Sequence, residues 1–161
     1  MGPVRLLAVT LVLAALPRAW ADDNWAQFRG GDKGGVAEAK TIPERWSTKE
    51  NVVWKTDIPG RGWSSPVVWK DRVFVTTVVS EEKLRDPKKG LYINDLQGKT
   101  PPGEHRWLVC CLDFKSGKML WQKEVHKGKS PGTIHLKNTH ASETPAVDGE
   151  RVYAVFGNIG V

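Results

Sequence analysis

The sequence predicts an all-β protein, on the evidence of its short apolar runs, its turn residues and its spacing of apolar side chains. After residue 21 no long stretch places apolar residues three and four positions apart, as an amphipathic helix would. Short runs rich in Val, Trp, Phe and Tyr instead alternate with Gly, Pro, Lys-Asp and Ser-Gly. Such a pattern is typical of strands joined by tight turns.

The first 21 residues have the features of a secretion signal. Met1 to Arg5 is short and positive, Leu6 to Leu16 is apolar, and Ala19-Trp20-Ala21 has the small-x-small pattern of a cleavage site. A buried N-terminal helix is the weaker alternative. The apolar run is also shorter than the roughly 20 residues that span a membrane. We therefore expect export to the periplasm or beyond, cleavage after Ala21, and a mature chain without a transmembrane segment.

Charge and cysteine content argue against a nucleic-acid-binding protein and against a disulfide-stabilised one. The formal charge is +6, and it falls to +4 when Arg5 and Arg18 leave with the signal. The lysines are scattered among carboxylates without regularly spaced aromatic residues, so we expect no nucleic-acid partner. The only cysteines, Cys110 and Cys111, are neighbours, and neighbours in a strand point to opposite faces. We expect two small buried residues rather than a disulfide.

The predicted strands are separated by three tight turns, at Lys70-Asp71, Phe114 to Gly117 and Asp148 to Glu150. The strands are Asn51–Ile58, Trp63–Trp69, Arg72–Val79, Arg106–Asp113, Lys118–Val125, and a last hairpin of Thr144–Val147 with Arg151–Phe156. Arg72–Val79 is apolar on both faces and should be covered on both. Lys118–Val125 turns polar in its later half, as an outer strand would. Inner and outer strands of these kinds are what the blades of a β-propeller require.

One hairpin recurs along the chain. Ser65-Pro66-Val67-Val68 with Arg72-Val73-Phe74 reappears as Thr144-Pro145-Ala146-Val147 with Arg151-Val152-Tyr153, each position 79 residues further on, as from Pro66 to Pro145. Lys118–Gln122 likewise resembles Asn51–Lys55, so that Trp121 corresponds to Trp54. Repetition at a long fixed spacing indicates a repeat architecture.

The segment from Cys111 to Trp121, CLDFKSGKMLW, resembles the tryptophan-docking motif of repeats of the PQQ (pyrroloquinoline quinone) type, A-x-D-x-x-T-G-K-x-x-W. The matching residues are Asp113, Gly117, Lys118 and Trp121, with Ser116 in place of Thr and Cys111 in place of Ala. Asn24–Gly30 and Arg61–Val68 are similar to the start of a group of secreted bacterial proteins with these repeats. That group is described as PQQ-binding-like, or as similar to the outer-membrane barrel-assembly lipoprotein. The resemblance covers residues 24–161.

The resemblance implies a partial β-propeller. Residues 22–50 would be a lead-in segment, and residues 51–161 would form about one complete four-stranded blade plus parts of two others. In the docking motif, Asp113 would accept N–H groups of the turn and Gly117 would take a positive φ. Trp121, and Trp54 before it, would pack against a neighbouring blade. Open strand edges lead us to expect that residues 22–161 aggregate when isolated.

A binding site is expected on the face that carries the long connections, Ser80 to His105 and His126 to Ala141. The best candidates are the residues that enter two equivalent inner strands: Arg61, Trp63, Ser64, His140, Ser142 and Glu143. These residues could instead only satisfy the strand ends. The spacing of His126, His135 and His140 matches no metal motif, so we expect solvent-facing or hydrogen-bonded histidines and no metal.

The residues show a scaffold motif without a recognisable catalytic constellation. We therefore expect an exported binding or scaffold module of the cell envelope, with a protein, peptide or carbohydrate ligand. The alternative is a quinoprotein dehydrogenase, with PQQ and calcium held by later blades. PQQ-dependent alcohol dehydrogenases hold their cofactor against a vicinal disulfide, yet here Cys111 occupies a structural position of the docking motif. A third hypothesis is a protein-assembly platform that pairs a blade edge with a partner strand.

Overall fold

The computed structural model describes residues 24–161 except for residues 32–33, 38–40, 83–98, 136 and 158. The predicted secretion signal, Met1 to Ala21, lies outside these residues. None of the helices in the described ranges has the length and apolar character needed to cross a membrane.

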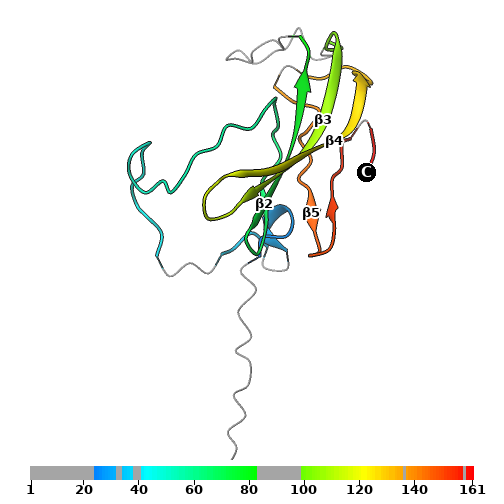
Figure 1. Ribbon diagram of the computed structural model, residues 1–161. Coiled ribbons are helices and arrows are strands. Elements are labelled where there is room, and N and C mark those ends of the chain that lie inside the picture. The colour runs from blue at the N-terminus through cyan, green and yellow to red at the C-terminus, as the bar shows by residue number, and fades with distance from the viewer. Residues whose placement is uncertain (1–23, 32–33, 38–40, 83–98, 136, 158) are drawn as a thin grey trace, which may run out of the picture.

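The fold is all-β, as predicted (Figure 1). Four antiparallel strands form one sheet in the order β1-β2-β3-β4. They are β1 (Val67–Trp69), β2 (Arg72–Ser80), β3 (Glu104–Asp113) and β4 (Met119–Lys129). A separate hairpin pairs β5 (Ala146–Val147) with β6 (Val152–Tyr153), and a 3-10 turn, η1, spans Phe28–Gly30. Adjacent strands follow each other in the sequence, so tight turns suffice to join β1 to β2 and β3 to β4.

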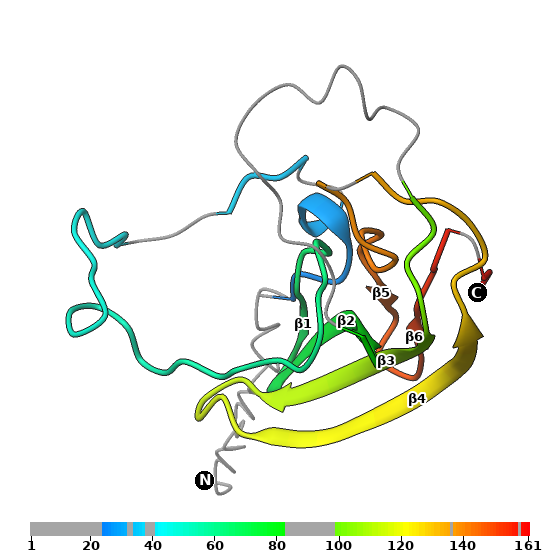
Figure 2. The ribbon, with the colours of Figure 1, turned by 90° about the horizontal axis from the view of Figure 1, so that it is seen from above.

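The hydrophobic core lies between the four-stranded sheet and the β5–β6 hairpin (Figure 2). Near the tight turns Val67, Phe74 and Cys111 pack with Val147 of the hairpin. Further along the sheet Val78 and Trp107, which are paired across β2 and β3, pack with Ala141 and Phe156. The two inner strands are therefore buried, whereas β4, at the sheet edge, is exposed along most of its length. This agrees with its prediction as an outer strand.

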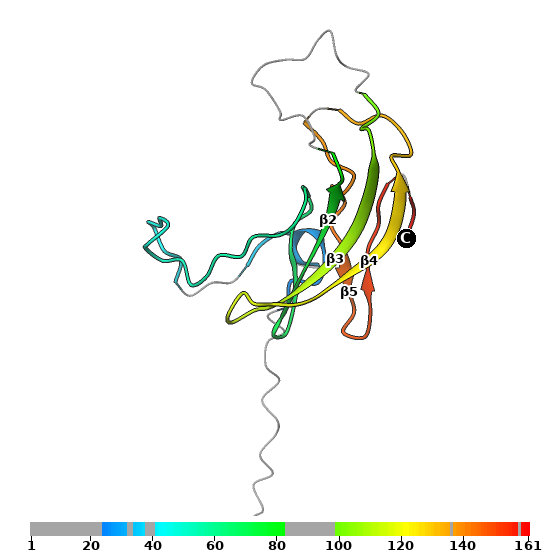
Figure 3. The same cartoon turned by 45° about the horizontal axis from the view of Figure 1, so that its top comes forward.

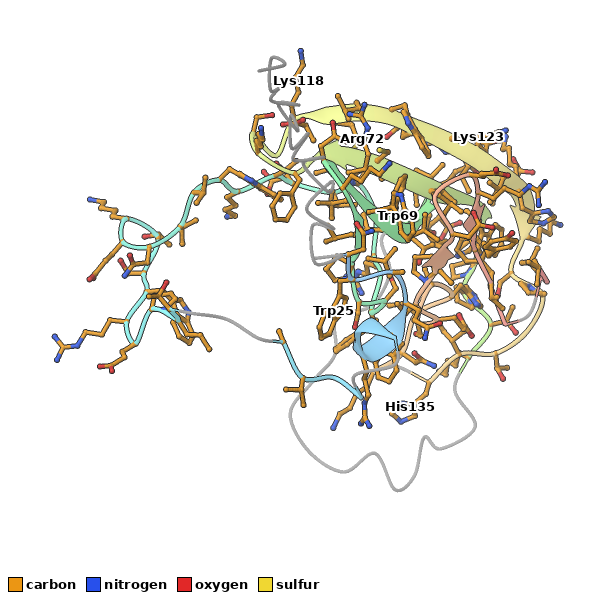
Figure 4. All side chains as sticks on the ribbon, turned by 90° about the horizontal axis from the view of Figure 1, so that it is seen from below. Trp25, Trp69, Arg72, Lys118, Lys123 and His135 are labelled. Carbon is orange, nitrogen blue, oxygen red and sulfur yellow. The ribbon has the colours of Figure 1, made fainter. Side chains whose placement is uncertain are left out.

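The lead-in residues Asn24–Ala26 join the sheet to the hairpin. Trp25 exchanges two backbone hydrogen bonds with Val68 of β1, at 2.9 and 2.8 Å. The N–H of Val147 in β5 donates to the carbonyl of Ala26 at 2.9 Å. The N–H of Lys70 donates to Asn24 Oδ1 at 2.6 Å. Trp25 and Trp69 both lie in this region (Figure 4). A three-residue segment thus supplies a hydrogen-bonding partner to an edge of each sheet.

The first predicted strand, Asn51–Ile58, is not a strand. The segment belongs to an extended arm that projects from the sheet (Figure 3), and its backbone makes no ladder bond to a described residue. Its contacts are made by side chains. Trp54 Nε1 donates to the carbonyl of Phe114 at 2.9 Å, and Thr56 Oγ1 donates to that of Gly117 at 2.6 Å. A β-rich sequence forms a strand only where another strand is beside it.

Other strand boundaries also differ from the prediction. The last hairpin is shorter than expected, with β5 limited to Ala146–Val147 and β6 to Val152–Tyr153. The strand expected over Trp63–Trp69 is regular only from Val67, because Pro66 has no N–H and the N–H of Ser65 donates to Thr144 Oγ1 at 3.0 Å. Strand β4 runs on to Lys129, so His126 lies in a strand and not in the long connection expected from His126 to Ala141. A bulge at Val125 brings His126 opposite Trp107.

Candidate functional site

A pocket of about 540 Å³ lies where the chain enters the sheet beside β2. Three segments form it: the approach to β1, the middle of β2, and the loop that precedes β5. Its lining residues are Ile58, Gly60, Arg61, Gly62, Trp63, Ser64, Val75, Thr76, Thr77, Asn138 and Thr139. Hydroxyl and amide groups therefore share this pocket with one arginine and one tryptophan.

Two glycines allow the first of these segments to lie close to β2. A Cβ on Gly60 would stand 2.3 Å from the carbonyl oxygen of Val78, and one on Gly62 would stand 2.5 Å from that of Thr76. Between them Arg61 exchanges backbone hydrogen bonds with Val78 at 2.9 and 3.0 Å. Trp63 follows, with 61 % of its surface exposed at the pocket. The glycines thus fix the backbone while the neighbouring side chains remain accessible.

The third segment is the strap, which we define as Asn138–Glu143. The carbonyl of Ala141 accepts hydrogen bonds from the N–H groups of Trp63 at 2.9 Å and Ser64 at 3.2 Å. Within the strap, Ser142 Oγ donates to Asn138 Oδ1, and Thr139 Oγ1 accepts from the N–H of Ala141 at 3.2 Å. The two predicted strand entries, far apart in sequence, are therefore directly bonded to each other.

Behind the strap, His140 packs into a buried aromatic group with His105 and Trp107 of β3. The ring centroids are 5.7 Å apart for His140 and His105, and 5.9 Å apart for His140 and Trp107. His140 Nε2 lies 2.9 Å from Ser130 Oγ. Burial, and to a smaller degree the neighbouring His105, lowers the pKa of His140, while Glu143 opposes this shift. His140 is therefore a neutral, hydrogen-bonded residue near neutral pH.

The six candidate residues divide into two sets. Arg61, Trp63 and Ser64 line the pocket, whereas His140, Ser142 and Glu143 do not. His140 bonds the strap to Ser130, and Ser142 bonds to Asn138 within the strap. Glu143 turns toward Gly157, where an added Cβ would meet its Oε1 at 2.5 Å. Sequence reasoning missed four polar lining residues: Thr76, Thr77, Asn138 and Thr139. For Thr76 and Thr77 the sequence did carry a signal, because two adjacent polar residues stand inside a valine-rich strand.

The residues of the docking motif form the turn between β3 and β4. Asp113 Oδ1 accepts from the N–H of Ser116 at 2.8 Å and from its hydroxyl at 2.6 Å, and these bonds lower the pKa of Asp113. Gly117 has a φ of 71°, the left-handed conformation expected of it. The carbonyl of Lys118 closes the turn by accepting from the N–H of Asp113 at 2.9 Å. Both predictions about this turn are confirmed.

The two tryptophans of the repeat have different surroundings. The ring of Trp54 lies on the turn, where a Cβ on Gly117 would stand 2.4 Å from it. The ring of Trp121 lies beside Phe74, with centroids 6.0 Å apart and planes tilted by 50°. Trp121 remains 43 % exposed.

The two cysteines are small buried residues of one strand. Cys110 and Cys111 are free and buried in the middle of β3, as expected of small core residues. Burial raises the pKa of both thiols. Because neighbours in a strand face opposite sides, only Cys111 joins the core cluster with Val67 and Phe74. In the described ranges, no group of three or more His, Cys, Asp or Glu residues is placed to hold a metal ion.

No protein-family model matches the chain, and no curated protein matches it at a significant level.

Proposed function

We propose that this protein is an exported binding module of the cell envelope, and that its ligand site is the pocket between Arg61–Ser64 and the strap. The observation that carries the proposal is the convergence of the two strand entries on one pocket, with Trp63 exposed beside it. Binding sites are concave, combining an apolar surface with a few fixed polar groups. Here hydrogen bonds to Val78 and Ala141 fix the backbone that carries these side chains.

A carbohydrate is the ligand class that fits this pocket best. One face of a sugar ring carries C–H groups that pack on an indole, while its hydroxyls exchange hydrogen bonds with amide and hydroxyl side chains. Trp63 supplies the indole, and Asn138, Thr139 and Ser64 supply the polar groups. A peptide added as a strand would need a free backbone edge. At this edge the N–H groups of Arg61, Trp63 and Ser64 already donate to protein carbonyls.

The placement of Trp54 supports a propeller-type scaffold around this pocket. Trp54 is the repeat counterpart of Trp121, and it lies on the Asp113–Gly117 turn of the following repeat. A tryptophan of one repeat docked on the turn of the next would hold successive blades together. Trp121 would dock in the same way on a further repeat.

Replacing Trp63 by Ala tests the ligand site. We expect the full chain to bind members of a panel of soluble neutral and uronic-acid oligosaccharides, measured by isothermal titration calorimetry. Truncation of a central aromatic contact commonly costs about 2 kcal/mol, so Trp63→Ala should weaken binding roughly thirtyfold. The control is Trp46→Ala on the arm, because Trp46 is 71 % exposed and lies outside the pocket.

Two results would contradict this proposal. One is the absence of binding to every oligosaccharide of the panel by the folded chain. The other is an equal loss of affinity in Trp63→Ala and Trp46→Ala, which would mean that binding does not depend on the pocket.

A protein-assembly platform is the second candidate, favoured by one observation. Strand β4 is last in the sheet order and is exposed along most of its 11 residues, so its outer edge has room for a partner strand. Lys123 points outward from it (Figure 4), and charged residues often guard such edges against pairing. A photo-crosslinker at Lys123 that captures a defined envelope protein, while one at Trp63 does not, would favour this candidate over the pocket.

A further inference from the structure

The strap forms part of the pocket and is also bonded to its opposite side. Asn138 and Thr139 line the pocket, and the carbonyl of Ala141 accepts from the N–H groups of Trp63 and Ser64. Movement of the strap would therefore remove lining residues and release the backbone that carries Trp63. His140 lies between these contacts, so whatever holds its ring also holds the pocket together.

Each buried histidine in this region already uses one ring nitrogen. The hydroxyl of Ser130 donates to the carbonyl of Gly132 at 2.7 Å, so its oxygen accepts from His140 Nε2. His105 Nδ1 lies 3.2 Å from the carbonyl of Gly103, which can only accept. These partners fix the neutral tautomers, with the proton of His140 on Nε2 and that of His105 on Nδ1. A further proton must therefore go to His140 Nδ1 or to His105 Nε2.

The surroundings of His140 are poorly suited to a second proton. His105 and Trp107 are fully buried, and neither His105 Nε2 nor Trp107 Nε1 has a hydrogen-bond partner among the described residues. His126 of β4 lies on Trp107, with ring centroids 5.0 Å apart, and adds another titratable imidazole. Glu143, on the strap itself, is the group within the described ranges that favours the charged form of His140. Charge on His140 is thus opposed by burial and by an imidazole on β3.

We propose that the strap is an acid-released latch, in which protonation of His140 drives its ring out from beside His105 and Trp107 and so opens the pocket. The latch regulates the site proposed above and rests on that proposal for its biological role. In the released strap His140 faces water, where an imidazole has a pKa of about 6.5. Its pKa is lower when the strap is closed, so release becomes more favourable as the pH falls below about 6.5.

Amide exchange tests the latch without any ligand. The N–H groups of Trp63 and Ser64 are protected by the carbonyl of Ala141, so their protection factors report strap closure. Measured by NMR on the full chain and corrected for intrinsic exchange, these factors should fall as the pH is lowered from 7.5 to 5.5. The fall can reach about tenfold, the limit for an imidazole of pKa 6.5 that is protonated only in the open state.

Two matched variants test whether the pH dependence of the protection factors arises from His140. His140→Gln keeps a donor for Ser130 but does not titrate, so its protection factors should be independent of pH over this range. His135→Gln is the control, because His135 lies in the same loop at the periphery of the molecule (Figure 4), and it should behave as the unaltered chain does. A constant protection factor in the unaltered chain, or a full fall in His140→Gln, would overturn the latch.

The unaltered chain supplies a second test that does not require the variant to fold. The ring protons of His140 should titrate below the ordinary imidazole pKa of about 6.5, and the protection factors of Trp63 and Ser64 should begin to fall near that ordinary value. Titration of His140 at its ordinary pKa, without a change in protection, contradicts the proposal. Because neither measurement contains an oligosaccharide, failure to bind one would leave the latch intact and would count only against the ligand class.

Discussion

At the scale of single residues, short polar side chains determine how the chain turns. Asp113, the last residue of β3, and Asp148, directly after β5, accept hydrogen bonds from the backbone two or three residues later. Asp148 Oδ2 also accepts from the hydroxyl of Tyr153 at 2.6 Å. These bonds favour the charged carboxylate, with that from Tyr153 contributing most, and they lower the pKa of Asp148 to about 2. A carboxyl group in an exposed turn can therefore have a pKa well below its ordinary value.

The pKa of Asp148 predicts how the second hairpin responds to acid. A carboxyl whose pKa is lower in the folded chain stabilises it above the unfolded value near 3.8, and this contribution is lost as the pH falls toward 2. The side-chain carboxyl signal of Asp148 should accordingly titrate near pH 2 by NMR. In Tyr153→Phe, which removes the largest cause, the midpoint should rise toward the ordinary value. An unchanged midpoint would mean that this hydrogen bond does not determine the shift.

At the scale of elements, tryptophan rings lie against glycines of positive φ. Trp25 contacts Gly30, Trp54 contacts Gly117, and Trp69 contacts Gly149, and a Cβ at each glycine would stand 2.4–2.7 Å from the ring. Each glycine therefore has two roles, because it takes a backbone conformation that side chains disfavour and leaves room for an indole. The sequence motif predicted the positive φ of Gly117, whereas the contact of each glycine with an indole appears only in the structure.

Gly117→Ala tests whether the docked Trp54 matters for stability. Alanine at this φ of 71° costs about 1–2 kcal/mol of unfolding free energy, and the clash with the ring adds about 1–3 kcal/mol. Gly34→Ala is the control, since Gly34 has a φ of 61° and no atom within 4 Å of its built Cβ. Urea unfolding should give a clearly larger loss for Gly117→Ala. Equal losses would show that the contact with Trp54 adds nothing.

At the scale of the whole molecule, Asn24–Ala26 and the strap connect the four-stranded sheet with the β5–β6 hairpin. The N-terminal segment bonds to β1 and β5, and the strap bonds to the approach to β1. Segments distant in sequence thus meet at one junction. The hairpin itself has only two residues in each strand and depends on these contacts for its position.

Deletion of residues 22–27 should uncouple the hairpin from the sheet. It removes the three backbone hydrogen bonds that Trp25 and Ala26 make with β1 and β5, each contributing about 1 kcal/mol. Hydrogen exchange should then show early opening of β5 and β6, while β2 and β3 remain protected. Trp46→Ala, at an exposed position of the arm, is a control that should leave the hairpin unchanged. Uniform loss of protection across all strands would contradict separate opening.

The sequence by itself determined the all-β class, the four strands of the main sheet, the turn at Asp113–Gly117 and the burial of both cysteines. Local patterns suffice for these because alternation, turn residues and side-chain size act over a few neighbouring positions. Three lining residues of the pocket were also foreseen, since Arg61, Trp63 and Ser64 precede a recognisable repeat.

Only the tertiary structure decided what the remaining segments do. Asn51–Ile58 has the composition of a strand but lies on a turn through its side chains, because no strand is beside it among the described residues. His140 is buried by contacts with β3, and Thr76, Thr77, Asn138 and Thr139 reach the pocket from two distant segments. What each of these residues does depends on neighbours that only folding brings close. Because those neighbours are far away in the sequence, no local pattern predicts the contacts.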